Sequence, residues 1–386
     1  MTTQPPSPDT STVDLGASRD RKPVVALVFG GRSAEHVVSC ATAASVLRSI
    51  DRERYDVLPI GITETGRWVL MADDPEPLQL TATHKPAVSG DNEVLISTDP
   101  AGHSLSLREP GQVPRELGEV DVVFPLLHGP FGEDGTIQGL LELSDMRYVG
   151  SGVSASAVMM DKHLMKVVFR SAGLPVGPYV LITDKEWQRD PAASMDPVAA
   201  LGWPVFVKPA RAGSSVGVTR VESADQLEAA IEHARQFDPK VLVEAAIVGR
   251  EVECGILEGR GSDPARASQI GEIAVTEGTH AFYDFESKYL DDSARLICPA
   301  DLPEDIAETI REQSIKAFDA AGCEGLARVD WFYSPDGTLT LNEINTMPGF
   351  TPTSMYPRVW DAQGVGYREL ITELIELALQ RRLGLR

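Results

Sequence analysis

The sequence LARVDWFYSPDGTLTLNEIN, at residues 326–345, is the most informative stretch of this chain. Two runs rich in β-branched, aromatic and aliphatic residues flank a Ser-Pro-Asp-Gly turn sequence, a pattern that predicts a β-hairpin. Side chains alternate between the two faces of a strand, so Arg328 and Asp330 share one face of the first strand. Glu343 and Asn345 share one face of the second. If both faces point the same way, a guanidinium, two carboxylates and an amide converge on one hairpin.

The oxygen atoms of Asp330, Glu343 and Asn345 form a donor set that suits Mg²⁺, which takes few protein ligands and completes its shell with water and phosphate oxygens. The same pattern also fits an ordinary hairpin whose charged side chains face solvent. The rest of the chain has to distinguish these two interpretations.

The composition indicates an ordinary globular protein of more than one domain. The chain has 386 residues, of which 42% are hydrophobic, and its mean hydropathy is −0.10, so about two or three domains are expected. A net charge of −22 opposes binding to nucleic acid or to an anionic membrane. The four cysteines are scattered, which indicates neither disulfides nor zinc and favours a reducing cytoplasm.

Residues 1–22 are rich in Pro, Ser, Thr and Asp and are expected to form a disordered leader. No apolar run is long enough to span a bilayer, so no membrane association is expected. Residues 24–29 predict a strand that is buried on both faces. Ser33 is placed to cap a following helix, and Glu35 falls in the first turn of that helix. Glu35 fits either compensation of the helix dipole or binding of a ligand ammonium group.

Residues 120–127 predict another buried strand, followed by His128 and a glycine-rich loop to residue 135. A single histidine at this position is more often structural than catalytic, but three glycines behind it indicate close approach of a ligand to the backbone. A helix is expected from about residue 155 to 171, carrying Asp161 and Lys162. A Gly- and Ser-rich segment near residue 150 predicts a domain boundary.

Lys208 ends a further strand, and the loop after it carries two glycines with Ser214 and Ser215. Freed backbone N–H groups and hydroxyls can form an anion cradle, although such a loop alone is weak evidence for phosphate binding. Ser223 and Gln226 predict a capping box at the next helix. Glu244 ends another apolar run, where it is either a solvated strand terminus or a reader of a purine amino group, with Glu251 on ribose hydroxyls. The segment 279–292 predicts an ordered loop or lid that would bring Lys288 and Tyr289 to the site.

Taken in order, these motifs resemble the ATP-grasp superfamily and, within it, the D-alanine–D-alanine ligases. The resemblance runs from about Val24 to the last helix. It rests on residues 29–36, 128–139, 150–162, 207–217, 282–289, 328–330 and 342–349. Each motif is weak alone, but their common order is a specific signal.

The resemblance implies an α/β, ATP-grasp architecture in which an N-terminal parallel-sheet domain precedes two ATP-grasp subdomains. The implied divisions are the leader at 1–22, the N-terminal domain at 23–150, the central subdomain at 151–248 and the C-terminal catalytic subdomain at 249–386. The implied reaction joins two D-alanines with ATP through an acyl phosphate, releasing ADP and phosphate. A cytoplasmic homodimer is expected, with D-alanine and ATP as its small-molecule partners.

The resemblance also implies roles for individual residues. Two Mg²⁺ ions, with Mn²⁺ as a substitute, would be held by Asp330, Glu343 and Asn345. The phosphates would be held by Lys162, Lys208, Lys288, Ser214 and Ser215, and the adenosine by Glu244 and Glu251. The catalytic set would be Glu35, Ser214, Tyr289, Arg328 and Gly349, with Arg328 and the Gly349 N–H stabilising an oxyanion. D-alanine would contact Glu35, His128, Lys288, Arg328 and Ser354.

In the family that is resembled, a tyrosine at the position of Tyr289 accompanies an amine as the second substrate. Two other functions remain open at this point. One is a related ligase that joins D-alanine to D-lactate or D-serine. The other is a catalytically silent nucleotide-binding protein that regulates a partner, against which the intact set of Asp330, Glu343, Asn345 and Arg328 argues.

Overall fold

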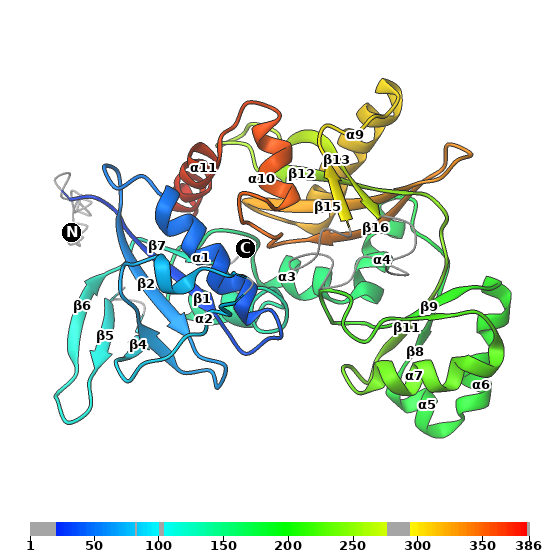
Figure 1. Ribbon diagram of the computed structural model, residues 1–386, viewed down its shortest axis with the longest axis horizontal. Coiled ribbons are helices and arrows are strands. Elements are labelled where there is room, and N and C mark those ends of the chain that lie inside the picture. The colour runs from blue at the N-terminus through cyan, green and yellow to red at the C-terminus, as the bar shows by residue number, and fades with distance from the viewer. Residues whose placement is uncertain (1–20, 82, 100–103, 276–293, 384–386) are drawn as a thin grey trace, which may run out of the picture.

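The computed structural model describes residues 21–81, 83–99, 104–275 and 294–383. In these residues the strands form three sheets, of seven, four and five strands. Figure 1 shows the seven-stranded sheet in blue and cyan at the left, the four-stranded sheet at the lower right, and the five-stranded sheet above it. Most of the expected leader and the whole of the segment 279–292, with Lys288 and Tyr289, lie outside the described residues.

The seven-stranded sheet is parallel at one edge and antiparallel over the rest. Strand β1 (Val24–Gly30) pairs in parallel with β2 (Asp56–Ile62) and with β7 (Val122–Pro125). The strands beyond β2 are antiparallel: β3 (Trp68–Leu70), β4 (Glu93–Ile96), β5 (Ser104–Arg108) and β6 (Arg115–Glu119). The expectation of a parallel sheet therefore holds for β2, β1 and β7, and the segment 72–118, which the sequence motifs left without a role, extends the sheet at the opposite edge.

The helices of this part are α1 (His36–Ser49), the short 3₁₀ helix η1 (Glu76–Leu78) and α2 (Thr136–Leu143). The expected cap at Ser33 is wrong, because α1 begins three residues later, with Glu35 at the N-cap position. The Ser33 hydroxyl instead accepts a hydrogen bond from the Glu35 N–H at 3.2 Å and donates one to the His128 carbonyl at 2.7 Å. Ser33 thus joins the loop after β1 to the loop after β7.

The four-stranded sheet is antiparallel throughout, in the order β10 (Thr219–Val221), β9 (Val205–Pro209), β11 (Val241–Ala245), β8 (Tyr179–Ile182). Its helices are α5 (Asp184–Arg189), α6 (Pro191–Met195), η2 (Asp196–Leu201), η3 (Ala224–Gln226) and α7 (Leu227–Arg235). Segment 184–199 thus contributes to this sheet's own core, where Trp187 and Val198 are buried.

The capping box expected at Ser223 and Gln226 is wrong. The Ser223 hydroxyl donates to Asp225 of η3, and the Gln226 side chain accepts from the N–H of Glu222 instead of that of Ser223. A capping box is present instead at the start of α5, between Thr183 and Glu186.

The single helix expected at 155–171 is two helices, α3 (Val153–Met160) and α4 (Lys162–Ser171). Asp161 separates them with extended backbone angles, φ −87° and ψ 102°. Its carboxylate accepts hydrogen bonds from the His163 and Leu164 N–H groups, so the residue that ends one helix caps the next.

The five-stranded sheet is antiparallel and contains the expected hairpin. Its order is β14 (Ala294–Ile297), β13 (Arg266–Val275), β12 (Arg250–Leu257), β15 (Leu326–Tyr333), β16 (Leu339–Asn345), and its helices are α9 (Glu304–Ala321), α10 (Met355–Asp361) and α11 (Tyr367–Gln380). Asp330 faces Glu343 and Arg328 faces Asn345 across the hairpin. The prediction that their side chains project together from one hairpin is confirmed. A bulge after Asp330, not expected from the sequence, places Trp331 opposite Leu341.

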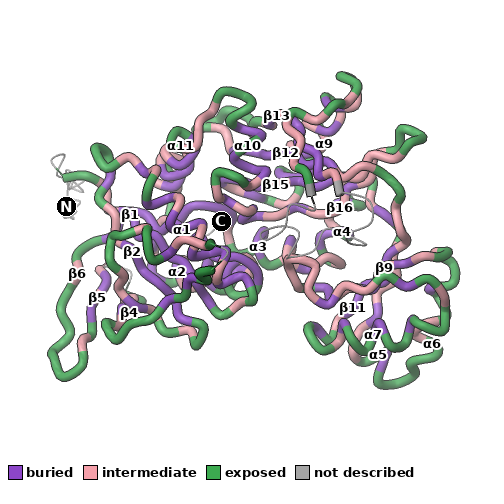
Figure 2. The backbone as a smooth tube through the Cα atoms, viewed as in Figure 1, coloured by how far each residue is buried: buried purple, intermediate pink, exposed green. Residues whose placement is uncertain are grey.

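The C-terminal helix completes the core of the seven-stranded sheet. One buried cluster includes residues of β1, α1 and β7 together with Phe350, Tyr356, Leu374 and Ile375. The Phe350 ring lies 5.9 Å from the Phe124 ring, centre to centre. Figure 2 shows buried stretches of the backbone along α1, β1 and α11. Among the described helices, none combines the length and the hydrophobicity that crossing a membrane requires.

Replacing Leu374 with alanine tests this shared core. Leu374 is fully buried in the cluster, so we expect the free energy of unfolding to fall by about 2 to 5 kcal/mol, since a cavity remains. Urea unfolding would measure it. The matched change Leu143→Ala removes a side chain that is 71% exposed and should cost less than about 0.5 kcal/mol. Equal losses in the two variants would contradict the proposed packing.

Candidate active site

A cavity of about 420 Å³ lies where the three sheets meet. It is lined by side chains from β9, β11, β12, β15, β16 and the loops that follow β1, β7 and β9. Of the site residues expected from the sequence, those that line it are Glu35, His128, Lys162, Lys208, Ser214, Ser215, Glu244, Glu251, Arg328, Asp330, Glu343, Asn345 and Gly349. Residues from separate motifs are thus brought to one cavity.

Three of the expected site residues are not in this lining. Lys288 and Tyr289 lie outside the described residues. Ser354 is the N-cap residue of α10, and its hydroxyl accepts from the Thr351 N–H at 3.2 Å and pairs with the Thr351 hydroxyl at 2.8 Å. The substrate-binding role of Ser354 stays a prediction.

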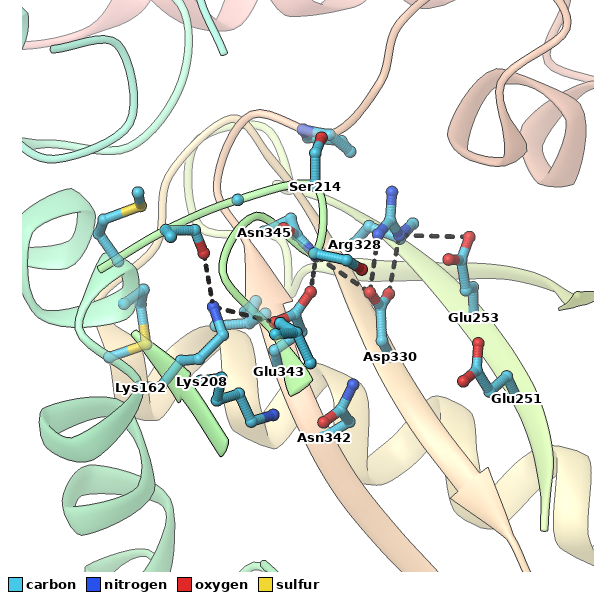
Figure 3. A pocket seen from close by; sticks show the side chains of 18 of the residues that line it. Lys162, Lys208, Ser214, Glu251, Glu253, Arg328, Asp330, Asn342, Glu343 and Asn345 are labelled. Carbon is cyan, nitrogen blue, oxygen red and sulfur yellow. Dashed lines mark hydrogen bonds and ion pairs between the residues drawn. The ribbon is translucent and has the colours of Figure 1, made fainter. Parts of the chain in front are cut away.

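Arg328 lies between two carboxylates on the wall of the cavity. Its guanidinium donates two hydrogen bonds of 2.7 Å to Asp330, and its Nε lies 3.2 Å from Glu253 on the neighbouring strand (Figure 3). Although burial would lower the pKa of Arg328, Asp330 and Glu253 hold that pKa well above its ordinary value. The guanidinium is therefore a fixed positive charge in the site.

Sequence reasoning missed Glu253, which is directly opposite Asp330 in the β12–β15 pairing. The available signal was its spacing, because Glu251 and Glu253 are two residues apart on one strand and so share a face. Together with Asp330 and Glu343 they make this wall of the cavity rich in carboxylates.

Asn345 joins the two carboxylates of the hairpin. Its amide nitrogen donates to Asp330 at 3.0 Å and to Glu343 at 3.5 Å, as Figure 3 shows. Within the described residues, no three His, Cys, Asp or Glu side chains group together as a metal site would require. The donor set is instead two carboxylates and one amide at a cavity wall. The oxygen atoms that these groups can offer fit Mg²⁺ and do not fit zinc.

Two lysines occupy the opposite side of the cavity. The Lys162 ammonium donates to the Ala212 carbonyl at 3.0 Å and lies 3.4 Å from Glu343. The Lys208 ammonium lies 2.5 Å from Glu244. Lys162 therefore reaches Glu343, one of the expected metal ligands, and Lys208 forms an ion pair with Glu244, the residue expected to bind adenine.

Glu244 is also held by Lys166, another residue that sequence reasoning missed. The Lys166 ammonium lies 3.2 Å from the second oxygen of Glu244 and is almost fully buried. Burial would raise the pKa of Glu244, but Lys208 and Lys166 lower it to about 2. Glu244 is thus an ionised buried carboxylate. Its partner could have been found from spacing, because Lys166 follows Lys162 by one helical turn.

Glu35 fills the space between two glycines and accepts a hydrogen bond from the loop that carries Ser214 and Ser215, which we call the serine loop. The Ser214 hydroxyl donates to Glu35 at 2.5 Å. A Cβ atom added to Gly129 would lie 2.5 Å from the Glu35 carboxylate, and one added to Gly213 would lie 3.0 Å from it. Ser214 and Ser215 both have left-handed backbone angles, φ 47° and 58°, a strained conformation that is typical of functional loops.

His128 links the first sheet to the turn after β16. Its Nδ1 lies 3.3 Å from the Met347 carbonyl, which can only accept, so Nδ1 carries the proton. Its Nε2 lies 3.4 Å from the Thr42 hydroxyl. Burial lowers the pKa of His128, which favours the neutral ring in this arrangement.

Glu133, another residue missed from the sequence, lines the cavity close to Glu35. Its carboxyl accepts a hydrogen bond of 2.7 Å from the Gly129 N–H. Loss of solvent and the nearby Glu35 charge raise the pKa of Glu133 to about 8. Two carboxyl groups on one side of the cavity make it a favourable place for a ligand ammonium, which would lower that pKa.

The family models for the D-ala D-ala ligase N-terminus and C-terminus match residues 24–151 and 168–376 of this chain. The chain belongs to the D-alanine–D-alanine ligase family. It is therefore an enzyme of the ligase class, and the reaction of its family is the joining of D-alanines in the synthesis of cell-wall precursors.

Proteins named D-alanine–D-alanine ligase are similar over almost the whole length. The relative from Arthrobacter sp. is 61% identical over 95% of this chain and 96% of its own. The relative from Streptomyces griseus is 55% identical over 95% of each chain.

Solved structures of the family share the fold. The VanG D-Ala:D-Ser ligase from Enterococcus faecalis has a TM-score of 0.80 at 34% identity, covering 93% of this chain and 100% of its own. The D-alanine-D-alanine ligase from Coxiella burnetii has a TM-score of 0.77 at 33% identity, covering 93% and 94%. The α/β, ATP-grasp architecture expected from the sequence is confirmed by these structures.

Replacing Glu133 with glutamine tests the raised pKa. Between about pH 4.5 and 8, native Glu133 keeps a proton that the unfolded chain has lost, so the wild-type chain loses stability as the pH rises through this window. The glutamine variant lacks this loss. We therefore expect the difference in unfolding free energy, variant minus wild type, to increase with pH by at most about 1.4 kcal/mol for each pH unit.

Urea unfolding at a series of pH values would measure the difference. The exposed residue Glu369 provides the matched control, and the Glu369→Gln variant should run parallel to the wild-type chain. A Glu133→Gln curve that also runs parallel would show that the Glu133 pKa is ordinary.

Proposed function

We propose that this chain forms D-alanyl-D-alanine from two D-alanines, with ATP converted to ADP and phosphate, as a cytoplasmic homodimer. The observation that carries the proposal is the meeting, in one cavity, of an ammonium-binding carboxylate, a fixed guanidinium, an oxygen donor set for Mg²⁺ and two lysines. No protein nucleophile is needed, because phosphoryl transfer depends on positioning and charge neutralisation.

ATP would enter with its adenosine towards Glu244 and Glu251 and its phosphates towards Lys162, Lys208, Ser214 and Ser215. The two lysines support this orientation. Lys208 forms an ion pair with Glu244, on the adenosine side, and Lys162 approaches Glu343, on the metal side. Lys288 is proposed as a further phosphate ligand. Asp330, Glu343 and Asn345 would hold two Mg²⁺ ions, for which Mn²⁺ can substitute, and the ions would neutralise phosphate charge when bound.

In the first step, a carboxylate oxygen of the first D-alanine attacks the γ-phosphorus, the bond to the ADP oxygen breaks, and an acyl phosphate forms. Glu35 would hold the ammonium of this D-alanine, and Glu133 is placed to share that charge. His128 would lie beside the same substrate. The close fit of Glu35 against Gly129 and Gly213 supports this assignment, because two residues without a Cβ hold the carboxylate in place and leave room for it.

In the second step, the amine of the other D-alanine, having lost a proton, attacks the acyl carbon, and phosphate then leaves. The oxyanion that develops would be stabilised by Arg328 and the Gly349 N–H, each such donor being worth roughly 3 kcal/mol in typical enzymes. Arg328 supports this role because its bonds to Asp330 and Glu253 fix its position. Lys288 and Ser354 are proposed to hold the second carboxylate, and Tyr289 to complete a hydrogen-bonded trio with Ser214 and Glu35.

A D-alanine–D-serine ligase is the second candidate, because the structural neighbour from Enterococcus faecalis is named for that activity. The higher identity to relatives named D-alanine–D-alanine ligase favours D-alanine as the second substrate. A silent regulatory protein is disfavoured by the complete set of charged residues in the cavity.

An ADP-release assay distinguishes these functions. The purified chain with ATP and Mg²⁺ is expected to release ADP with D-alanine alone, and mass spectrometry should find the dipeptide. Adding D-serine or D-lactate should give little mixed product at neutral pH. Preferential formation of either mixed product would move the chain to the corresponding ligase, and no ADP release at all would remove the proposed reaction.

Replacing Glu343 with glutamine removes one carboxylate charge from the metal-type set. We expect ADP release to fall by at least about a hundredfold, since phosphate charge would be poorly neutralised. The exposed residue Glu222 gives the control, and Glu222→Gln should keep the parent rate. Retention of more than a third of the parent rate by Glu343→Gln would contradict the assigned role.

A further inference from the structure

Four side chains of alternating charge lie at the base of the loop that carries Ser214. Asp161 binds the Lys240 ammonium through both carboxylate oxygens, at 2.9 and 2.7 Å. The backbone N–H of Lys240 donates to the Asp238 carboxylate at 3.0 Å. Asp238 in turn accepts bonds of 2.9 and 2.8 Å from the Arg211 guanidinium. We call Arg211, Asp238, Lys240 and Asp161 the loop-base network.

The network is built into the protein interior at its two carboxylates. The side chains of Asp161 and Asp238 are 7% and 3% exposed. Burial raises the pKa of Asp238, but the hydrogen bonds from Arg211 outweigh it and hold that pKa below its ordinary value. Buried carboxylates of this kind are costly unless they are paired, so each depends on its cation.

The loop-base network joins two parts of the fold. Asp161 separates α3 from α4, which pack in the core of the five-stranded sheet through Met159, Met165 and Phe169. Lys240 precedes β11 of the four-stranded sheet. The Asp161–Lys240 pair therefore joins the helices packed on the five-stranded sheet to the start of an inner strand of the four-stranded sheet.

Ala210 is held between the same two partners through its backbone. Its N–H donates to the Lys240 carbonyl at 2.9 Å, and its carbonyl accepts from the Lys162 N–H at 3.0 Å. The Arg211 N–H then donates to Asp238 at 3.0 Å. Ala210 and Arg211, at the start of the serine loop, are thus held by Lys240 and Asp238 of the loop-base network and by the backbone of Lys162.

Lys162 is the functional residue that this arrangement places. Its backbone direction is set at Asp161, where the chain leaves α3, turns and enters α4 under the Asp161 cap. From that start, the ammonium reaches both Ala212 of the loop and Glu343 of the hairpin. Nothing in the chemistry proposed for the cavity uses Asp161 or Lys240 directly.

We propose that Asp161 is a positioning residue for Lys162 and the serine loop, acting through its ion pair with Lys240. The proposal deepens the proposed function, because it concerns the residues assigned to the ATP phosphates. Its consequence is specific: loss of the pair displaces the phosphate-binding groups and weakens ATP binding. D-alanine binding changes less, because only Gly213 and Ser214 on one side of Glu35 belong to the loop, whereas Gly129 and Arg328 do not.

Three variants separate positioning from simple charge compensation. Asp161→Asn keeps a side chain that caps helices as well as aspartate does, so α4 can still form. Lys240→Met removes the cation. The double variant removes both charges and leaves neither one buried without its partner. The control is the exposed pair of Arg52 and Asp73, which also has two short bonds, at 2.8 and 2.6 Å, with side chains 40% and 46% exposed.

We expect each single variant to melt at a lower temperature and to raise the KM for ATP about tenfold. The double variant should regain most of the melting temperature but keep the raised KM for ATP. The KM for D-alanine should stay within about twofold in all of them. Asp73→Asn, Arg52→Met and their double variant should leave both KM values unchanged.

A double variant with the parent KM for ATP would overturn the proposal, since the pair would then only compensate charge. An equal rise in both KM values would overturn it as well, because the effect would be general. The Kd for ADP, measured by calorimetry, tests the same displacement without turnover, and an unchanged Kd in Asp161→Asn would also count against it. Absence of ADP release by the parent chain would instead contradict the proposed function and leave the binding comparison to decide about Asp161.

Discussion

The pairing of Arg328 with Asp330 and Glu253 is the interaction on which the cavity depends. Without the guanidinium, neighbouring strands of one sheet would bring carboxylates together at a buried wall, and their mutual repulsion would oppose the strand pairing. The guanidinium contacts two of these carboxylates and offsets their repulsion, so the strands stay paired. The same principle recurs where Lys166 and Lys208 hold Glu244 and where Lys240 holds Asp161. The site is thus largely a set of compensated charges, and near Glu35 and Glu133 the charge of one acidic group raises the pKa of the other.

The local sequence was sufficient to predict structure where a single regularity, such as the alternation of side chains along a strand, determines it. The hairpin at 326–345 followed from alternation and a turn sequence, and the glycine-rich loops followed from residues that permit close backbone approach. The antiparallel extension formed by β4 to β6 was less visible, because its short runs of β-forming residues lie among Pro, Gly and Asp. The two helix caps predicted wrongly, at Ser33 and Ser223, show a further limit. A serine before an apolar run can donate to a neighbouring carbonyl or carboxylate instead, and only the tertiary contact decides which partner it takes.

Residues missed in the site share one property, since each acts through a partner distant in sequence. Glu253 meets Arg328 across a strand pair, Lys166 meets Glu244 across two elements, and Glu133 meets Glu35 across two loops. A single sequence shows none of these distances, and their spacing signals were weak because lysine and glutamate are common on exposed faces. The break at Asp161 was missed for a related reason, because residues on both sides of it favour helix. The chain leaves the helix there because Lys240 and two backbone N–H groups bind the Asp161 carboxylate.

The packing of α11 against the first sheet also constrains how the chain acquires its structure during synthesis. The N-terminal strands are synthesised well before Leu370, Ile371, Leu374 and Ile375, which cover part of their core. At about 5 to 20 residues per second, the apolar face shared by α1 and β1 waits for many seconds before its cover emerges. During that interval it is a surface that chaperones would recognise. The core of the first sheet is therefore complete only after α11 has been made, and a chain cut short before α11 would retain that exposed face.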